Sequence, residues 1–208
     1  MKITLAWLKK HNACAEGMEY CERKGLIGLP ADQFAEKLVE GNKLSWANWL
    51  IAHALQKLDK VRYAVYAAEQ VLPIFDKKYP GDDRPKNAIA AAKAYIENPC
   101  ADTAHAAHAD AYADAYDAVF ATYTPHAYAA DTAAYAAAYA ADAAHATTYA
   151  TDAADATTYA ADAAAHAHAG IYEKVLRYGI NLLKNENHKG MVYRRVIRKT
   201  IMELCSMV

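Results

Sequence analysis

The sequence has no apolar run that approaches the length of a membrane span, and its first ten residues, MKITLAWLKK, contain no long apolar core before their charges. A transmembrane helix needs about 20 consecutive, mostly apolar residues, and a secretory signal needs an apolar core of its own. We therefore expect a protein that neither crosses a membrane nor uses one as a partner.

Cysteine is scarce, and none of it has the spacing of a redox or zinc motif. The four cysteines are Cys14, Cys21, Cys100 and Cys205, with no CxxC pair among them. Cys14 and Cys21 are seven positions apart, about 10 Å along a helix, which is too far for a disulfide within that helix. We expect free thiols in a reducing cytoplasm.

The motifs that usually identify an enzyme are absent from the first half of the chain. It contains no glycine-rich phosphate loop, no HExxH, no GxSxG and no metal-finger spacing. A hydrolase with paired carboxylates is not favoured either, because no pair is distinguished from the other aspartates. The sequence therefore predicts no catalytic residues and no cofactor, and a protein that is not an enzyme.

Residues 101–170 lack Lys, Arg and Glu entirely, and about half of them are alanine. Their nine Asp give a net charge of −9, so the rest of the chain must sum to +8 to reach the overall −1. Residues 171–208 supply +5 of that, from eight Lys and Arg against three Glu. This asymmetry indicates internal docking or charged partners. A nucleic-acid partner is not expected, because such proteins usually show a stronger basic excess.

Within this tract, Tyr, Asp and His recur every three or four positions, which is helical spacing. The mean step is about 3.5, the period of a helix seam in a left-handed supercoil. We call these residues the seam: Tyr128, Asp131, Tyr135, Tyr139, Asp142, His145, Tyr149, Asp152, Asp155, Tyr159, Asp162 and His166.

The seam is the candidate partner-binding surface. Alanine has the highest helix propensity, and its small side chain lets helices approach closely. We therefore expect the alanine faces to be packed, which leaves the seam in water or lining a site. Tyr offers rigid contact area with a hydroxyl, and Asp offers charge toward a basic protein partner. A solvated stripe, a small-molecule site and a homo-oligomer interface remain open as alternatives.

Metal binding and ice binding are two further alternatives. Divalent metals accept His and Asp ligands, and three sets have helical spacing: Asp102 with His105 and His108, Asp142 with His145, and Asp162 with His166. These groups are spread over many turns, so no metal site is predicted. Thr147 and Thr158 are eleven positions apart, as in helical antifreeze proteins, but other threonines do not continue this register.

The whole chain predicts one all-α domain, a helical bundle of about seven to nine helices with a long Ala-rich helical hairpin or array. Residues 1–100 form an N-terminal helical bundle, residues 101–170 the array, and residues 171–208 basic C-terminal helices, the last of which docks on the body. Asn12 is expected to cap the second helix, and Pro73 to kink or end a long one. His53 is expected to be partly buried with one hydrogen bond.

Two blocks resemble a known family. They are WLKKHNACAEGMEYCERKG at residues 7–25 and AVYAAEQVLPIFDKKYPGDDRPKNAIAAAKAYIENP at residues 64–99, followed by the Ala-rich tract. Together they resemble a family of putative immunity proteins, similar to the fifth immunity class of bacterial polymorphic-toxin systems, with relatives in phage genomes. The resemblance covers about residues 5–170 in general organisation. It implies an intracellular protein that neutralises a toxin or effector by binding.

The sequence therefore predicts an immunity protein, antitoxin-like, that acts by stoichiometric binding in the cytoplasm of a bacterial or phage-infected host cell. One alternative is a phage anti-defence protein that sequesters a nucleotide signal or blocks a defence effector. Another is a helical structural or ice-binding-like protein. The resemblance assigns no functional residues.

Overall fold

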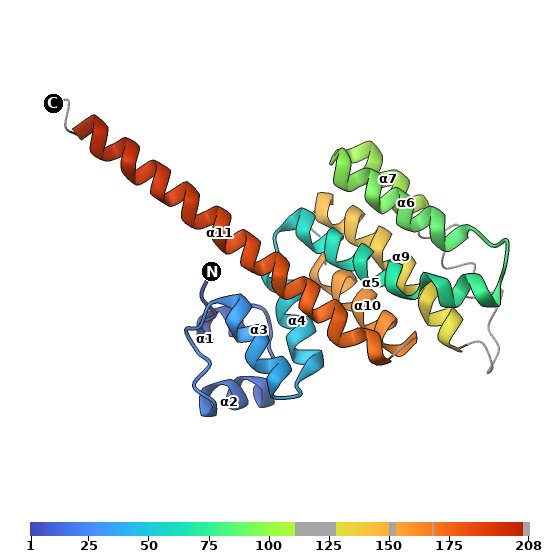
Figure 1. Ribbon diagram of the computed structural model, residues 1–208, viewed down its shortest axis with the longest axis horizontal. Coiled ribbons are helices and arrows are strands. Elements are labelled where there is room, and N and C mark those ends of the chain that lie inside the picture. Colours follow the sequence, from blue (N-terminus) through green and yellow to red (C-terminus); the bar gives the residue numbers. More distant parts are fainter. Residues whose placement is uncertain (111–127, 150–152, 168, 206–208) are drawn as a thin grey trace.

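The computed structural model describes residues 1–110, 128–149, 153–167 and 169–205, with side chains for 1–109, 135–146, 154–166 and 170–188. These residues contain ten α-helices and, as their only extended pairing, an isolated bridge between Lys2 and Pro30 (Figure 1). The all-α prediction is confirmed. The described helices slightly outnumber the expected seven to nine, partly because the seam is divided between two of them.

Four short helices form the N-terminal part. They are α1 (Leu5–Lys10), α2 (Ala15–Arg23), α3 (Ala31–Glu40) and α4 (Leu44–Ala54). The Thr4 hydroxyl caps α1 by accepting from the Trp7 amide at 3.2 Å. The cap predicted at Asn12 is wrong: Asn12 adopts a left-handed conformation, with φ of 58°, and Cys14 caps α2 instead. Asparagine tolerates this conformation better than most residues.

The long helix α5 (Lys57–Lys78) lies at the centre of the molecule, and α6 (Arg84–Glu97) follows it (Figure 1). Helix α5 continues past Pro73, whose ring faces solvent, so the proline does not end it. The buried face of α5 packs against α6, α9, α10 and α11. Its fully buried members include Val61, Tyr63, Val71 and Phe75.

The alanine tract forms α7 (Ala101–Asp110), α9 (Tyr128–Tyr149) and α10 (Ala153–Ala167). Helices α9 and α10 pack against each other and against α5, while α7 packs against α6 and α9. Alanines occupy the contact faces, with Ala137, Ala140 and Ala161 completely buried. The predicted packing of the alanine faces is confirmed. The seam, however, does not follow one array; it is divided between two helices that pack side by side.

A 3-10 turn at Ala169–Ile171 leads into α11 (Tyr172–Cys205). Its first half packs on α3, α4 and α5 through Val175, Leu176 and Leu183. A Cβ at Gly179 would lie 2.6 Å from both Ile51 Cγ2 and Tyr63 Cε2, so this close crossing requires glycine.

The C-terminal segment is one continuous helix, although the sequence indicated two. Figure 1 shows the second half of α11 extending away from the other helices, so the predicted docking of a last helix on the body is wrong. The helices that α11 contacts most are α3, α4, α5 and α10, and all of these lie along its first half (Figure 1). In the described part of the chain, no helix combines the length and apolar character that a membrane span needs.

Candidate functional site

The seam is only partly placed by the structure. Asp152 lies outside the described residues, and the side chains of Tyr128, Asp131 and Tyr149 lie outside the described side chains. The remaining eight members are Tyr135, Tyr139, Asp142 and His145 on α9, and Asp155, Tyr159, Asp162 and His166 on α10. Six of them fall into three groups with different environments, and the other two, Asp155 and His166, lie outside these groups.

Three seam tyrosines form one aromatic strip across α9 and α10, which we call the tyrosine row. The rings of Tyr135 and Tyr139 are stacked with centroids 6.2 Å apart, and those of Tyr139 and Tyr159 are 5.3 Å apart. Tyr135 and Tyr139 are half-buried against the core, whereas Tyr159 is 52% exposed. A rigid aromatic strip with an exposed end is typical of an interface anchor.

Asp162, by contrast, is part of an interior polar network. Its Oδ1 accepts from Asn48 Nδ2 at 2.9 Å and from the Tyr172 hydroxyl at 2.6 Å. Asn48 is fully buried, donates to the Thr158 carbonyl at 3.1 Å, and accepts from the Tyr63 hydroxyl at 2.9 Å. Burial, followed by the Asp162 charge, raises the pKa values of both tyrosines. Asp162 on α10 therefore links α4 and α11 directly, and α5 through Asn48, and its role is to stabilise the fold.

The third group, the histidine cluster, joins α7 to α9. The rings of His108 and His145 are stacked with centroids 4.1 Å apart, and His105 lies 5.8 Å from His145. His108 Nδ1 is 3.5 Å from Asp142 Oδ1. Partial burial, and then His108 and His105, lower the pKa of His145. The neutral form of the His145 ring, which stacks on His108, is therefore favoured.

The His and Asp sets whose spacing makes them alternative metal ligands have different surroundings in the structure. His166 Nδ1 is 2.7 Å from the Asp162 carbonyl, one turn away in its own helix, and Asp102 is exposed. The cross-helix pairing of His108 with His145 could not be read from spacing along one helix. Among the residues that the structure describes, no group of three or more His, Cys, Asp or Glu is placed to hold a metal ion.

Asp155 is exposed beside a buried amine that the sequence analysis did not single out. Burial lowers the pKa of Lys60 to about 8, while the charges of Glu186 and Asp155 oppose this shift. Lys60 Nζ donates to the Ala52 carbonyl. Nearby, His53 Nδ1–H donates to the Trp49 carbonyl at 2.8 Å, which confirms the expectation of one hydrogen bond. Asp155 thus lies close enough to α4 and α5 for its charge to act on His53 and Lys60, while its own side chain stays exposed.

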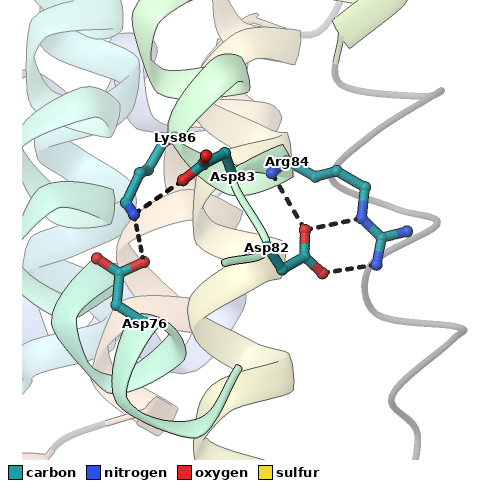
Figure 2. Close-up of polar contacts among 5 residues, drawn as sticks. All are labelled: Asp76, Asp82, Asp83, Arg84 and Lys86. Atoms are coloured by element: carbon teal, nitrogen blue, oxygen red, sulfur yellow. Dashed lines mark hydrogen bonds and ion pairs between the residues drawn. The ribbon is translucent and has the colours of Figure 1, made fainter. Parts of the chain in front are cut away.

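The corner between α5 and α6, which belongs to the second resemblance block, is held by ion pairs (Figure 2). Arg84 binds Asp82 with two parallel bonds of 2.9 and 2.6 Å, and these contacts lower the pKa of Asp82. Lys86 Nζ bridges Asp83 at 3.0 Å and Asp76 at 3.2 Å. These ion pairs form between residues of the corner itself, so their role is to stabilise the connection between α5 and α6.

Among the pockets formed by described residues, two lie away from the seam. One, of about 240 Å³, lies among α1, α2, α3 and α4. The other, of about 490 Å³, is an open depression formed by residues of α5 and α11 such as Tyr66, Lys174 and Tyr178. Neither is lined by a seam residue, so neither supports the alternative in which the seam holds a small molecule.

Comparison with family models identifies a relationship to known proteins. A family model described as Imm-5 like putative immunity protein matches residues 52–186, which is more than half of the chain. The matched range includes α5 to α10 and every seam residue. No curated protein and no solved structure matches the chain.

Proposed function

The chain belongs to the Imm-5 like putative immunity protein family, and from this premise we propose that it neutralises a toxin or effector protein by binding it in a stoichiometric complex. The family match is the observation that carries the proposal. Binding without turnover is consistent with the surface chemistry, in which exposed aromatic and acidic groups lie on rigid helices. The bound toxin would lose access to its target.

The binding surface that we propose is the exposed part of the seam, centred on the tyrosine row. Tyr159 projects from α10 with Tyr139 and Tyr135 behind it, and Asp155 and His166 are exposed on the same helix. Residues 101–170 have a net charge of −9, so a basic partner surface is favoured. Because Asp162 is held by Asn48 and Tyr172, we assign it to positioning α10 and not to the contact itself.

The test begins with native mass spectrometry of the tagged protein purified from cells that naturally carry it. We expect a protein partner at fixed stoichiometry. The partner gene, expressed from an inducible promoter, should arrest growth, and co-expression of this protein should restore it. Tyr159→Ala should abolish rescue while leaving the helical content unchanged, because Tyr159 is half exposed and an aromatic hot spot contributes about 2 kcal/mol or more to binding.

Tyr178→Ala is the matched control, because it removes one tyrosine from the α5–α11 contact, where it stacks on Tyr66 at 3.9 Å. Rescue should persist in this variant. If a folded Tyr159→Ala protein still protects cells, the seam is not the binding surface. If the purified protein carries a nucleotide and no protein partner, the immunity proposal is wrong and the sequestration alternative replaces it.

A further inference from the structure

A second candidate site lies among the N-terminal helices, away from the seam helices. The pocket of about 240 Å³ among the four N-terminal helices is lined by Leu8, Asn12, Ala13, Cys14, Gly17, Met18, Cys21, Phe34, Leu38, Trp46, Trp49 and Leu50. All of these residues precede Ala52, so the pocket lies outside the family-matched range. The pocket is therefore separate from the seam, and a ligand in it can be tested without reference to the proposed immunity function.

The walls of the pocket exclude charged ligands. Its base is formed by core side chains that are almost completely buried, Leu8, Phe34, Leu38 and Leu50. No charged residue lines it, and Asn12 is the one lining residue with an amide side chain. A charged group moved into such a site would lose its hydration without gaining a partner, which is strongly unfavourable. The occupant must therefore be neutral and mostly apolar.

The volume limits the size of that occupant. An engineered cavity of roughly 150 Å³ lined by Leu, Ile and Phe stays dry and binds benzene. Sites for drug-sized ligands begin at roughly 300 Å³. At about 240 Å³ this pocket falls between the two. We propose that it binds a small neutral apolar molecule of one or two rings.

The rim has features that keep the pocket accessible. Cys14 is exposed, and Asn12 holds its left-handed conformation beside it. Gly17 has no side chain at this edge of the pocket. A Cβ added there would lie 3.1 Å from Cys14 Sγ and 3.8 Å from the Trp46 ring, so any larger residue would narrow the opening between them. Trp46 is fixed in turn by Lys43, whose Nζ lies 4.4 Å from its ring centroid. The ligand would enter between α2 and α4.

The direct test is titration of the full-length protein with indole and with toluene. Thermal unfolding follows both titrations, and tryptophan fluorescence follows the toluene titration, because free indole itself emits where tryptophan does. We expect saturable binding and a rise in Tm that follows the occupied fraction, as linkage requires. Leu38→Phe should fill the pocket and weaken binding by about tenfold or more. Leu72→Phe, the same change at a half-buried position of α5 that does not line the pocket, should leave binding unchanged.

Cysteine alkylation gives a second readout that needs no variant. Burial raises the pKa of Cys21 to about 11, so its thiol should react slowly with iodoacetamide at pH 8. Cys14 at the rim is exposed. Cys100, which precedes α7 and does not line the pocket, is partly exposed, and hydrogen bonds with Thr103 lower its pKa. Indole should slow alkylation of Cys14 and leave that of Cys100 unchanged, as read by peptide mapping.

The proposal is wrong if neither compound binds saturably to the wild-type protein. It is also wrong if a folded Leu38→Phe protein binds as tightly as wild type, because the ligand would then lie elsewhere. Growth rescue by the seam is a separate assay that does not involve this pocket. Failure of one proposal is therefore distinguishable from failure of the other.

Discussion

The N-terminal helices and the alanine helices fill their interiors with side chains of opposite size. Between α1 and α4 the interior is made of large side chains such as Phe34, Leu38 and Leu50, each 2% exposed or less. Between α9 and α10 it is made almost entirely of alanine, with Ala137, Ala140 and Ala161 fully buried. A buried Leu or Phe contributes about 1.5–3 kcal/mol of transfer free energy. Alanine contributes far less, so the second region depends on close helix approach and on high helix propensity.

This difference explains where each candidate site is found. Large side chains meeting from four short helices leave a pocket of about 240 Å³. Closely packed alanine helices leave no room for large side chains between them. The large side chains lie at the edges of the contact instead, where the seam tyrosines of α9 and α10 form one row. The first region is therefore suited to a small apolar ligand, and the second presents a surface suited to a protein.

The largest effect should come from truncating a side chain in the N-terminal core. Phe34→Ala should lower the free energy of unfolding by about 3–5 kcal/mol, because it removes a ring from a site with 0% exposure. Urea denaturation monitored by circular dichroism measures this. Phe34→Leu, which keeps most of the volume, should cost less than half as much. Equal losses for the two variants would show that the region is not packed as described.

In the alanine region, enlarging a buried side chain should destabilise the fold more than truncating one. Ala140→Leu should lower the free energy of unfolding by about 1–3 kcal/mol, because a fully buried alanine at a helix contact leaves no room for three more carbons. Ala94→Leu, at an exposed position of α6, is the matched control and should change stability by less than about 0.5 kcal/mol. If Ala140→Leu is neutral or stabilising, α9 and α10 are not in close contact.

The sequence predicted the fold class, the burial of the alanine faces and the environment of His53, because these depend on local spacing and composition. It did not predict which seam residues face inward. Asp155 and Asp162 have the same type and helical spacing, yet Asp162 lies against Asn48 and Tyr172, and Asp155 stays exposed.

That distinction depends on how α10 docks on other helices, which periodicity along one helix does not contain. The same reason applies to the contact between His108 and His145, which come from α7 and α9. It applies also to the pocket, which depends on how four consecutive short helices pack against one another.

The smallest expected effect concerns the pH dependence of stability. It tests whether acid lowers the stability of both regions in the same way. Partial burial lowers the pKa of His11 and His53 in the first region and of His145 in the second. A base whose folded pKa lies below its unfolded value of about 6.5 takes up a proton later in the folded state. Its contribution to stability is complete above pH 6.5 and is lost as the pH falls toward the folded pKa.

We therefore expect His145→Gln to reduce the loss of stability between pH 7.5 and 5.5, measured by urea denaturation. The reduction should be below about 0.5 kcal/mol, because the ring is partly exposed and solvent screens its charge. Asp142 beside the histidine cluster favours protonation of His145 and opposes the effect.

His53→Gln should reduce the loss of stability more than His145→Gln, since His53 is the more buried ring. Comparison of each variant with wild type cancels the other titrating groups, including Glu186, whose pKa burial raises. An increased loss in His145→Gln would mean that Asp142 outweighs burial in the alanine region, where aspartate is the only acidic residue type and no Lys or Arg occurs.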